Sequence, residues 1–270
     1  LLDNLRIETG VLDPDSGRVS VQVSLNGEQF STDALIYTYT PPVQVVSLDP
    51  ASGPRLGGTH VNITTESVLH GGVDFRCAFD GVVVTASMET DSIISCVTPA
   101  HPDLITASAV PMAITSNGQD FTSSTLDFVY YDAVPSIHTI SPLSSPSRGG
   151  SIVSVIGAGL GHGSQPRCSF GIFGTVSGSL LGPYSMLCHT PAAKPFTAVP
   201  LEVALNAQQY TTRSLSFSFY AHAVVSALSP ILGPVLGDTH VRISGLGFDG
   251  GTPGTYACRF GEVRVAATFV

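Results

Sequence analysis

A glycine-rich run from Gly157 to Gly163 contains residue types that could do chemistry. Backbone N–H groups in such runs cradle phosphate when the spacing is G-x-G-x-x-G and a helix follows. The spacing here is G-A-G-L-G-H-G, and no helical pattern comes after it. The matching stretch Ser244-Gly-Leu-Gly-Phe248 has the same character, so we interpret both as turns at the end of a strand.

Asp13-Pro-Asp15 and eight histidines are the other candidate ligands. The two aspartates offer hard oxygens for calcium, but further acidic ligands at fixed offsets are missing, so an Asx-type turn is the better interpretation. His60 and His240 occupy matching places, which indicates a structural or surface role. No H-x-x-x-H helix spacing and no G-x-S-x-G elbow occurs. We therefore expect no enzyme activity, no cofactor and no metal site.

The charge pattern excludes two classes of partner. Eleven Lys and Arg against twenty Asp and Glu give a net charge of −9, and the basic residues lie far apart. Phosphate backbones and anionic membranes require clustered positive charge, so we expect neither nucleic-acid binding nor direct membrane insertion. At 43% apolar and 11% charged residues, the chain is too apolar to be disordered. Its 28 Gly and 19 Pro are spread throughout, which is typical of short strands joined by turns.

One hairpin-like segment occurs three times. It extends from Val19 through Asn26-Gly27 to Phe30, and recurs around Asn117-Gly118 and Asn206-Ala207. Apolar residues alternate before the turn and predict a half-buried strand. Asn-Gly predicts a tight hairpin because both residues tolerate positive φ. Ala207 replaces the glycine in the third copy and allows a different turn type there.

Two further blocks repeat in the same order. The copies of the first block are Pro50 to Gly57-Gly58-Thr59, Pro142 to Gly149-Gly150 and Pro230 to Gly237-Asp238. The copies of the second block are Arg76-Cys77-Ala-Phe79, Arg167-Cys168-Ser-Phe170 and Ala257-Cys258-Arg-Phe260. A shared order and period of about 90 residues predict tandem modules. We expect the C-terminal part of a module in 1–41, complete modules in 42–132 and 133–221, and the N-terminal part of another in 222–270. Short Pro-containing joints predict a semi-rigid rod.

These blocks resemble the IPT/TIG family of immunoglobulin-like modules. The resemblance rests on Gly57-Gly58-Thr59, Cys96-Val-Thr98-Pro99, Asn117-Gly118 and Phe128/Tyr130, and on Gly149-Gly150, Gly157-Ala-Gly159-Leu160, Cys188-His-Thr190-Pro191 and Phe217/Phe219 in the second copy. It implies an all-β chain of tandem immunoglobulin-like β-sandwich modules in a rod-like array. The family occurs in ectodomains of plexins, hepatocyte-growth-factor-receptor-like kinases and fibrocystin-like proteins. It also occurs in transcription factors and starch-processing enzymes, so fold does not decide function.

The five cysteines follow the repeat. Cys77 and Cys96 lie 19 residues apart, Cys168 and Cys188 lie 20 apart, and each pair holds the same place in its unit. We interpret them as one disulfide per module, worth roughly 3 kcal/mol in the chain-entropy model. Buried free thiols in an intracellular protein are the alternative. Cys258 matches the first cysteine of a pair, and we expect its partner to lie beyond residue 270.

Asn62-Ile63-Thr64 is a glycosylation sequon. Val61 and Ile63 should face the core, which turns Asn62 outward and makes a glycan there possible. Together with the paired cysteines, the sequon favours an extracellular or cell-surface location.

Binding specificity should lie in the stretches that do not repeat, because recognition in sandwich arrays sits on end loops or exposed faces. One such stretch is 66–72. The other is 171–181, whose apolar residues we expect to be a strand pair filling its own core.

We therefore expect a noncatalytic extracellular segment of a large cell-surface or secreted protein. It would serve as a spacer and as an adhesion or ligand-recognition scaffold for cell-surface or matrix proteins. The alternatives are an intracellular transcription-factor-type module that dimerises or contacts DNA, and an accessory domain of a polysaccharide-processing enzyme. The dispersed arginines argue against the first alternative, and the absence of Trp argues against the second.

Overall fold

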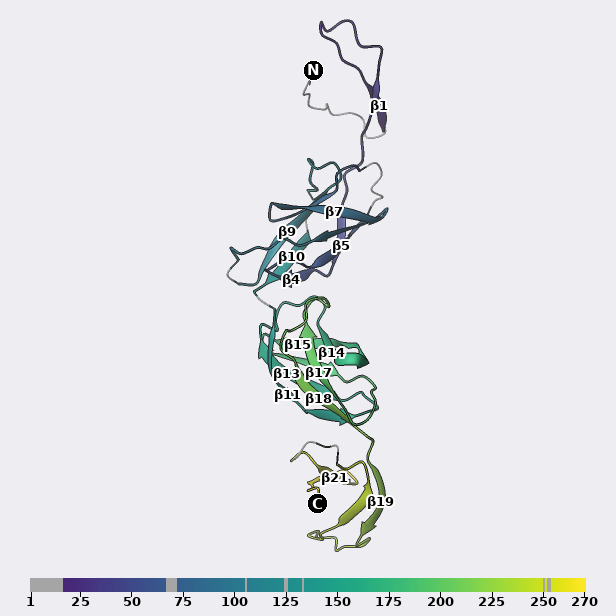
Figure 1. Ribbon diagram of the computed structural model, residues 1–270, viewed down its shortest axis with the longest axis vertical. Helices are drawn as coiled ribbons and strands as arrows, with labels where there is room; N and C mark the ends of the chain where they lie inside the picture. Colours follow the sequence, from purple (N-terminus) through teal and green to yellow (C-terminus); the bar gives the residue numbers. More distant parts are fainter. Residues whose placement is uncertain are drawn as a thin grey trace.

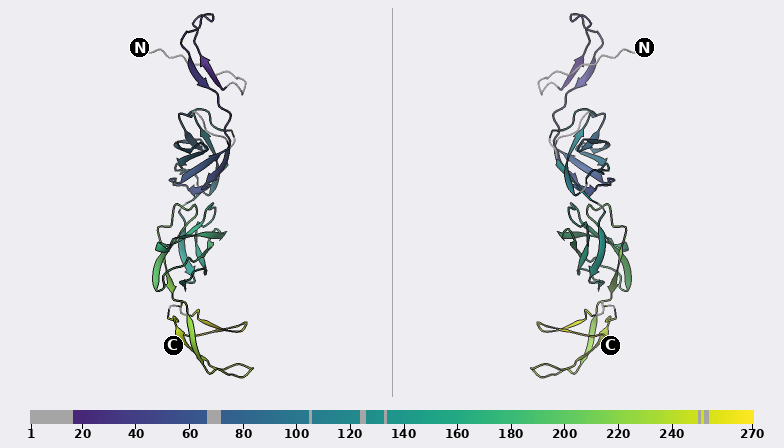
Figure 2. Two further views of the ribbon diagram at one scale, coloured as in Figure 1. Left: turned by 90° about the vertical axis from the view of Figure 1, so that its right-hand side faces the viewer. Right: turned by 90° about the vertical axis from the view of Figure 1, so that its left-hand side faces the viewer.

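The structure is a computed structural model that describes residues 17–66, 72–104, 106–123, 126–132, 134–249, 251 and 254–270. Within these ranges the regular elements are β-strands and one 3-10 turn, Gly171–Phe173. The units follow one another along a single long axis, with β1 at one end of the rod and β19 and β21 at the other (Figure 1). Two side views show the same extended arrangement (Figure 2).

Two complete sandwiches form the middle of the rod. The first sandwich contains β3 (Val45–Asp49), β4 (Ser52–Pro54), β5 (His60–Thr65), β6 (Arg76–Phe79), β7 (Val82–Thr90), β8 (Ile93–Val97), β9 (Ser108–Thr115) and β10 (Leu126–Tyr131). The second sandwich contains β11 (Ser136–Ser141), β12 (Ser144–Pro146), β13 (Ile152–Ala158), β14 (Arg167–Phe170), β15 (Thr175–Gly182), β16 (Ser185–His189), β17 (Thr197–Ala204) and β18 (Leu215–Tyr220).

The two sandwiches share one topology. The strand order is β3-β5-β8-β7-β6-β9-β10-β4 in the first and β11-β13-β16-β15-β14-β17-β18-β12 in the second. Neighbouring strands are antiparallel except that β4 pairs parallel with β10, as β12 does with β18. β7 pairs with β6 through Val82–Thr85 and then with β8 from Ala86 onward, so one long strand passes between the two layers. These repeated strands confirm the all-β tandem fold expected from the repeats.

Each core contains aromatic residues that recur in the same order along the repeat. In the first sandwich Phe79 lies edge-to-face on Phe128, with ring centroids 5.4 Å apart, and Phe128 on Tyr130 at 5.0 Å. The second sandwich places Phe170, Phe217 and Phe219 in the same way, at 5.3 Å and 5.2 Å. Edge-to-face pairs add about 0.5–1.5 kcal/mol each beyond the area they bury.

Two-stranded sheets lie at each end of the rod. β1 (Arg18–Val21) pairs with β2 (Leu35–Thr38) at one end. The other end contains β19 (Val224–Ser229), β20 (Arg242–Leu246), β21 (Ala257–Phe260) and β22 (Val263–Ala266). The expected half-buried strand after Val19 is wrong in its second half, because β1 ends at Val21 and Leu25 is 95% exposed. No second sheet lies against β1 among the described residues, and its apolar side chains, Val19 and Val21, are only half-buried.

The Asn turns differ from the tight hairpin that the sequence predicts. Gly27, Gly118 and Ala207 have positive φ, at 79°, 74° and 61°, whereas the preceding asparagines do not. The Asn117 side chain instead accepts the N–H groups of Gln119 and Asp120 at 3.0 and 2.9 Å. This is an Asx turn in a wider loop. Ala207 follows the same path as its glycine counterparts, so the turn type does not change in the third copy.

The 171–181 stretch is partly the expected strand. β15 alternates between exposed and half-buried residues, with Val176 and Leu180 packed against the second core. Phe173 contacts Phe219 at 5.4 Å between ring centroids. Ile172 is 84% exposed and Leu181 63% exposed, so not all of its apolar side chains fill the core. In the 66–72 stretch, residues 67–71 lie outside the described residues.

We expect Gly57→Ala to destabilise the first sandwich more than Gly58→Ala. Both glycines have a φ near +80°, which costs an alanine about 1–2 kcal/mol. A Cβ on Gly57 would also lie 2.6 Å from the Pro99 backbone, whereas nothing lies within 4 Å of one on Gly58. Urea unfolding of each variant measures the difference, and equal losses would contradict it.

A matched control for this pair is Gly58→Asp. The unit that follows the second sandwich has Asp238 at the corresponding position, with a φ of 65°. Aspartate tolerates this region better than most residues, so Gly58→Asp should cost less than Gly57→Asp.

Candidate interaction surface at the junction of the two sandwiches

The first sandwich presents to the second a surface that we call the loop face, comprising Asp49, Ser52, Gly58, Thr59 and His60. Gly58 N–H donates to Thr98 O at 2.9 Å, and Thr59 N–H donates to Thr98 Oγ1 at 3.0 Å, which fixes the loop. β3 ends at Asp49, which lies opposite Asn62 in the register. β5 therefore extends past β3, and His60 has no partner on that strand.

The second sandwich presents an amide face, comprising Gln165, Asn206, Gln208 and Gln209. The Asn206 side chain accepts the N–H groups of Gln208 and Gln209 at 3.2 and 3.1 Å, so the turn holds both glutamines side by side. Asn206 also donates to Gln209 Oε1. These contacts orient the Gln209 amide from within its own turn.

The two glutamines pair with the backbone of the loop face. Gln208 Nε2 donates to His60 O at 2.7 Å while Gln208 Oε1 accepts His60 N–H at 2.9 Å. A primary amide has the donor and acceptor of a peptide group, so Gln208 replaces the missing strand partner of His60. Gln209 Nε2 donates to Gly58 O at 2.9 Å, and its Oε1 accepts the Thr59 hydroxyl at 3.2 Å.

A second group of polar contacts lies beside the first. The Ser52 hydroxyl donates to Ser164 Oγ and accepts Ser164 N–H, both at 2.9 Å. Gln165 Nε2 donates to the Asp49 carboxylate. Asn206 donates to Thr59 Oγ1 at 3.2 Å and is fully buried. Buried polar groups are stable only when paired, so these contacts make the junction specific as well as stable.

Arg55 fixes the chain segment between the sandwiches. Its Nε atom lies 2.7 Å from Asp132 O and 2.8 Å from Asp132 Oδ1, and its Nη1 atom donates to Leu104 O at 3.0 Å. Arg55 N–H also donates to Tyr131 O at 2.9 Å. Arg55 therefore anchors Asp132, the residue that follows β10, to the first sandwich.

A cavity of about 270 Å³ lies next to this segment, with Tyr131, Asp132, Gly159 and His162 among its lining residues. Tyr131 is 2% exposed, and its hydroxyl has no hydrogen-bond partner among the described residues. Burial raises the pKa of this phenol well above its usual range, so the group stays neutral. The cavity belongs to the joint, and no cluster of three His, Cys, Asp or Glu suited to a metal occurs in the described ranges.

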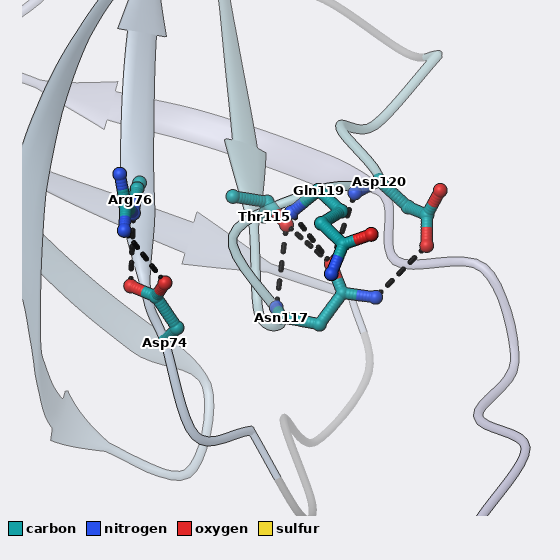
Figure 3. Close-up of polar contacts among 6 residues, drawn as sticks. All are labelled: Asp74, Arg76, Thr115, Asn117, Gln119 and Asp120. Carbon is teal, nitrogen blue, oxygen red and sulfur yellow. Dashed lines mark hydrogen bonds and ion pairs between the residues drawn. The ribbon is translucent and has the colours of Figure 1, made fainter. Parts of the chain in front are cut away.

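The first sandwich has a counterpart of the amide face at its opposite end. This first amide face comprises Asp74, Asn117, Gln119 and Asp120, which match Gln165, Asn206, Gln208 and Gln209 in the repeat. Asn117 Nδ2 donates to Asp120 Oδ2 at 2.8 Å, and Thr115 donates to Asn117 Oδ1 at 2.9 Å (Figure 3). Unlike Asn206, Asn117 is exposed.

Two acidic residues distinguish this first amide face. Arg76 donates from Nε and Nη2 to the two carboxylate oxygens of Asp74 at 2.9 and 2.8 Å (Figure 3). The hydrogen bond from Arg76 lowers the pKa of the Asp74 carboxyl, and the same contact raises the pKa of the Arg76 guanidinium. Arg167, the counterpart of Arg76, donates to Ser177 Oγ at 2.8 Å.

The cysteines lie where the repeat places them. Cys77 is joined to Cys96 and Cys168 to Cys188 as disulfides, with Cα–Cα distances of 6.6 and 6.2 Å. Both disulfides lie in the cores and connect the two layers of each sandwich. Cys258, on β21, is free and partly exposed.

The other residues singled out by sequence lie apart from one another. Asn62 is exposed on β5 between buried Val61 and Ile63. The Gly157–Gly163 run contains the end of β13 and the turn after it, with Leu160 buried. Asp13 and Asp15 lie outside the described residues.

Sequence reasoning missed the glutamines of the junction. A signal was present, because Asn26-Gly-Glu-Gln29, Asn117-Gly-Gln-Asp120 and Asn206-Ala-Gln-Gln209 repeat a polar pair after each asparagine. The contact of Gln208 and Gln209 with the first sandwich depends on how the two sandwiches stack.

The family model for the IPT/TIG domain matches residues 42–130 and 135–219. Among solved structures, the plexin A4 full extracellular region, domains 1 to 10, is 17% identical with a TM-score of 0.51, over 94% of this chain and 24% of that one. This chain therefore spans about a quarter of that ectodomain, and the likeness shows the fold alone.

A looser likeness is to FdeC, an Escherichia coli adhesin. It is 12% identical with a TM-score of 0.29, over 76% of this chain and 74% of that one. This score is too low to support an argument. Among the described residues, no helix is long and apolar enough to cross a membrane.

We expect Arg76→Gln to raise the pKa of Asp74 toward that of a free aspartate. The charge-assisted bonds that favour the carboxylate would be lost. Because the folded pKa is lowered, the pair stabilises the fold above the unfolded pKa near 4, and this contribution is lost as pH falls. NMR titration of the Asp74 carboxyl carbon measures the shift.

Arg167→Gln is the matched control, since Arg167 faces a serine hydroxyl and no carboxylate. It should leave the Asp74 pKa unchanged. An unchanged Asp74 pKa in Arg76→Gln would show that the ion pair is not its cause.

Proposed function

This chain belongs to the IPT/TIG domain family, and on that premise we propose that it is a noncatalytic spacer and recognition scaffold. It would form part of the extracellular region of a cell-surface or secreted protein. Its modules would be residues 42–132 and 133–221, flanked by parts of modules in 1–41 and 222–270. Its partners would be cell-surface or matrix proteins.

The junction between the sandwiches is the observation that supports a spacer role. Gln208 and Gln209 make four hydrogen bonds to the loop face. Each contributes about 0.5–1.5 kcal/mol net, so the set can hold one orientation of the joint. A spacer needs such joints, because a flexible linker would not fix the distance between its ends.

The disulfides support the proposed compartment. Cys77–Cys96 and Cys168–Cys188 each connect the layers of one core. Disulfides form and persist in oxidising compartments and are rare in cytosolic proteins. Non-reducing peptide mapping of the secreted chain should recover both pairs, and free thiols at Cys77 and Cys96 would argue for the intracellular alternative.

Recognition is proposed for the exposed outer faces and not for a pocket. Asn62 lies between Asp49 and Ser95 in the register, so a glycan there would cover the outer face of the β3-β5-β8 layer. Protein partners would then contact the remaining surface. The acidic balance of −9 favours partners with basic patches.

We expect the double variant Gln208→Ala/Gln209→Ala to loosen the joint while both sandwiches stay folded. Small-angle X-ray scattering should show a broader distribution of interatomic distances than for the parent chain. Glu28→Ala/Gln29→Ala alters the corresponding exposed turn of the first unit and is the matched control. Identical scattering for both variants would show that the glutamines do not fix the joint.

We also expect the chain to carry a glycan at Asn62 when it passes through a eukaryotic secretory pathway. Thr64→Ala should remove it without changing Asn62 itself, because the acceptor sequence requires Ser or Thr at this position. Intact mass before and after glycosidase treatment measures occupancy. A parent mass that glycosidase treatment leaves unchanged would show that the site is unused.

A further inference from the structure

We propose that one outer face of the second sandwich binds the same face of a second copy of this chain, with the two rods antiparallel. The contact surface, which we call the neutral face, comprises Ser154, Ile156, Leu181, Tyr184 and Leu187. This inference goes beyond the proposed scaffold role and does not depend on the compartment or on a glycan at Asn62.

The neutral face is formed by three neighbouring strands, β13, β16 and β15. Val153 and Val155 of β13 are fully buried in the core, so Ser154 and Ile156 face outward. Ile156 is 45% exposed. Ser154 lies opposite Leu187 of β16, so these two side chains lie next to each other on the outer side of the layer.

Leu181 and Tyr184 extend this face to the end of β15. Leu180 packs against the core, whereas Leu181, at the register shift that follows, is 63% exposed. Tyr184 is 67% exposed in the turn between β15 and β16, and its carbonyl accepts the N–H of Gly157, which follows Ile156. Apolar side chains from three strands therefore share one side of the layer.

The exposure of the neutral face does not depend on either end of the chain. The second sandwich has the same eight strands as the first, and it stands between the first sandwich and β19 to β22 (Figures 1 and 2). Ile152 is exposed as well but is not part of this face, because its counterpart His60 contacts the following sandwich.

The first sandwich has polar residues at all five corresponding positions. These counterparts are Asn62, Thr64, Glu89, Ser92 and Ser95. The Ser95 hydroxyl donates to the Glu89 carboxylate there. The fold therefore does not require apolar side chains on these strands, and an exposed apolar patch of this kind is typical of a contact surface.

The absence of charge on this face indicates what binds it. The strands β11 (Ser136–Ser141), β13, β15 and β16 contain no Asp, Glu, Lys or Arg. A charged partner would lose hydration here without gaining a countercharge. Two copies of the neutral face meet without repulsion although the chain has a net charge of −9, and such a face is its own complement, as a two-fold contact requires.

The distribution of charge along the rod decides the orientation. Residues 42–132 contain ten Asp and Glu and two Arg, a net charge of −8, whereas residues 222–270 contain three charges of each sign. Parallel rods in contact through their second sandwiches would place the two segments of −8 side by side. Antiparallel rods place each of these segments beside the neutral 222–270 segment of the other copy and avoid that repulsion.

The size of the neutral face limits the strength of the contact. Three strands about 4.8 Å apart and about five residues long cover roughly 240 Å², well below the ~800 Å² per partner of a stable interface. The contact is therefore weak and reversible, and high concentration is needed to populate it.

Disulfide trapping in the full chain tests the contact. Ser154→Cys places a thiol on the neutral face, where two-fold symmetry brings it close to the same thiol of the second copy. Cys258→Ser removes the free thiol, and Thr64→Ala removes the glycan acceptor sequence. Under mild oxidation at high concentration, we expect disulfide-linked dimers.

Asn62→Cys in the same background is the matched control, because Asn62 holds the place of Ser154 in the first sandwich. Ser154→Cys should form dimers several times faster than this control. Equal rates for the two thiols would overturn the proposal, as would a Ser154→Cys chain that stays monomeric.

Small-angle X-ray scattering of the linked dimer tests the orientation. Antiparallel rods joined at their second sandwiches overlap only in part, so the dimer should be longer than a single chain by about one module. A dimer no longer than the single chain would show that the rods are parallel and overturn the antiparallel arrangement.

Sedimentation equilibrium of the chain without introduced cysteines provides a second test. Ile156→Thr/Leu181→Glu introduces the residues that the first sandwich has at these places, so the fold tolerates them. This variant should weaken self-association by about tenfold or more, since it brings like charges together across the two-fold axis.

Ser216→Glu is its matched control, because Ser216 is exposed on β18 in the other layer. It adds the same charge away from the neutral face and should leave self-association nearly unchanged. Equal weakening by both variants would attribute the effect to net charge and overturn the contact at the neutral face.

Discussion

The contact between the two sandwiches depends on strand β5, whose backbone extends beyond the end of its neighbour β3. β5 begins two residues before the register with β3 starts, so His60 has an N–H and a C=O that β3 does not pair. Leaving such groups without a partner in a contact would cost about 1–3 kcal/mol. Gln208 satisfies both with one side chain, and that pairing orients the second sandwich relative to the first.

Other features of the molecule serve this contact. Gly57 lets the loop pass close to the Pro99 backbone, and Thr98 fixes the loop backbone. The Asx turn at Asn206 presents the glutamines, and Arg55 holds the end of β10 in place. Disulfides and aromatic residues keep each core rigid enough for its ends to act as defined surfaces.

The repeat also shows how similar module ends can differ in charge. The Asn turn and the strand overhang recur, and only the side chains that they present change. Exchange of Gln165 for Asp74 and of Gln209 for Asp120 converts a neutral amide face into an acidic one. A few substitutions on a fixed scaffold thus change the charge of a module end without altering either core.

The sequence by itself determined the fold class, the order of the repeated blocks within a module and the pairing of the cysteines. It did so because alternation, turn residues and a period of about 90 residues are local or repeated signals. It did not determine the role of Asn117 and Asn206, which cap a wider loop through their side chains. Nor did it locate Gln208 and Gln209 against Gly58 and His60. Those contacts join residues about 150 positions apart, and only the stacking of the two sandwiches brings them together.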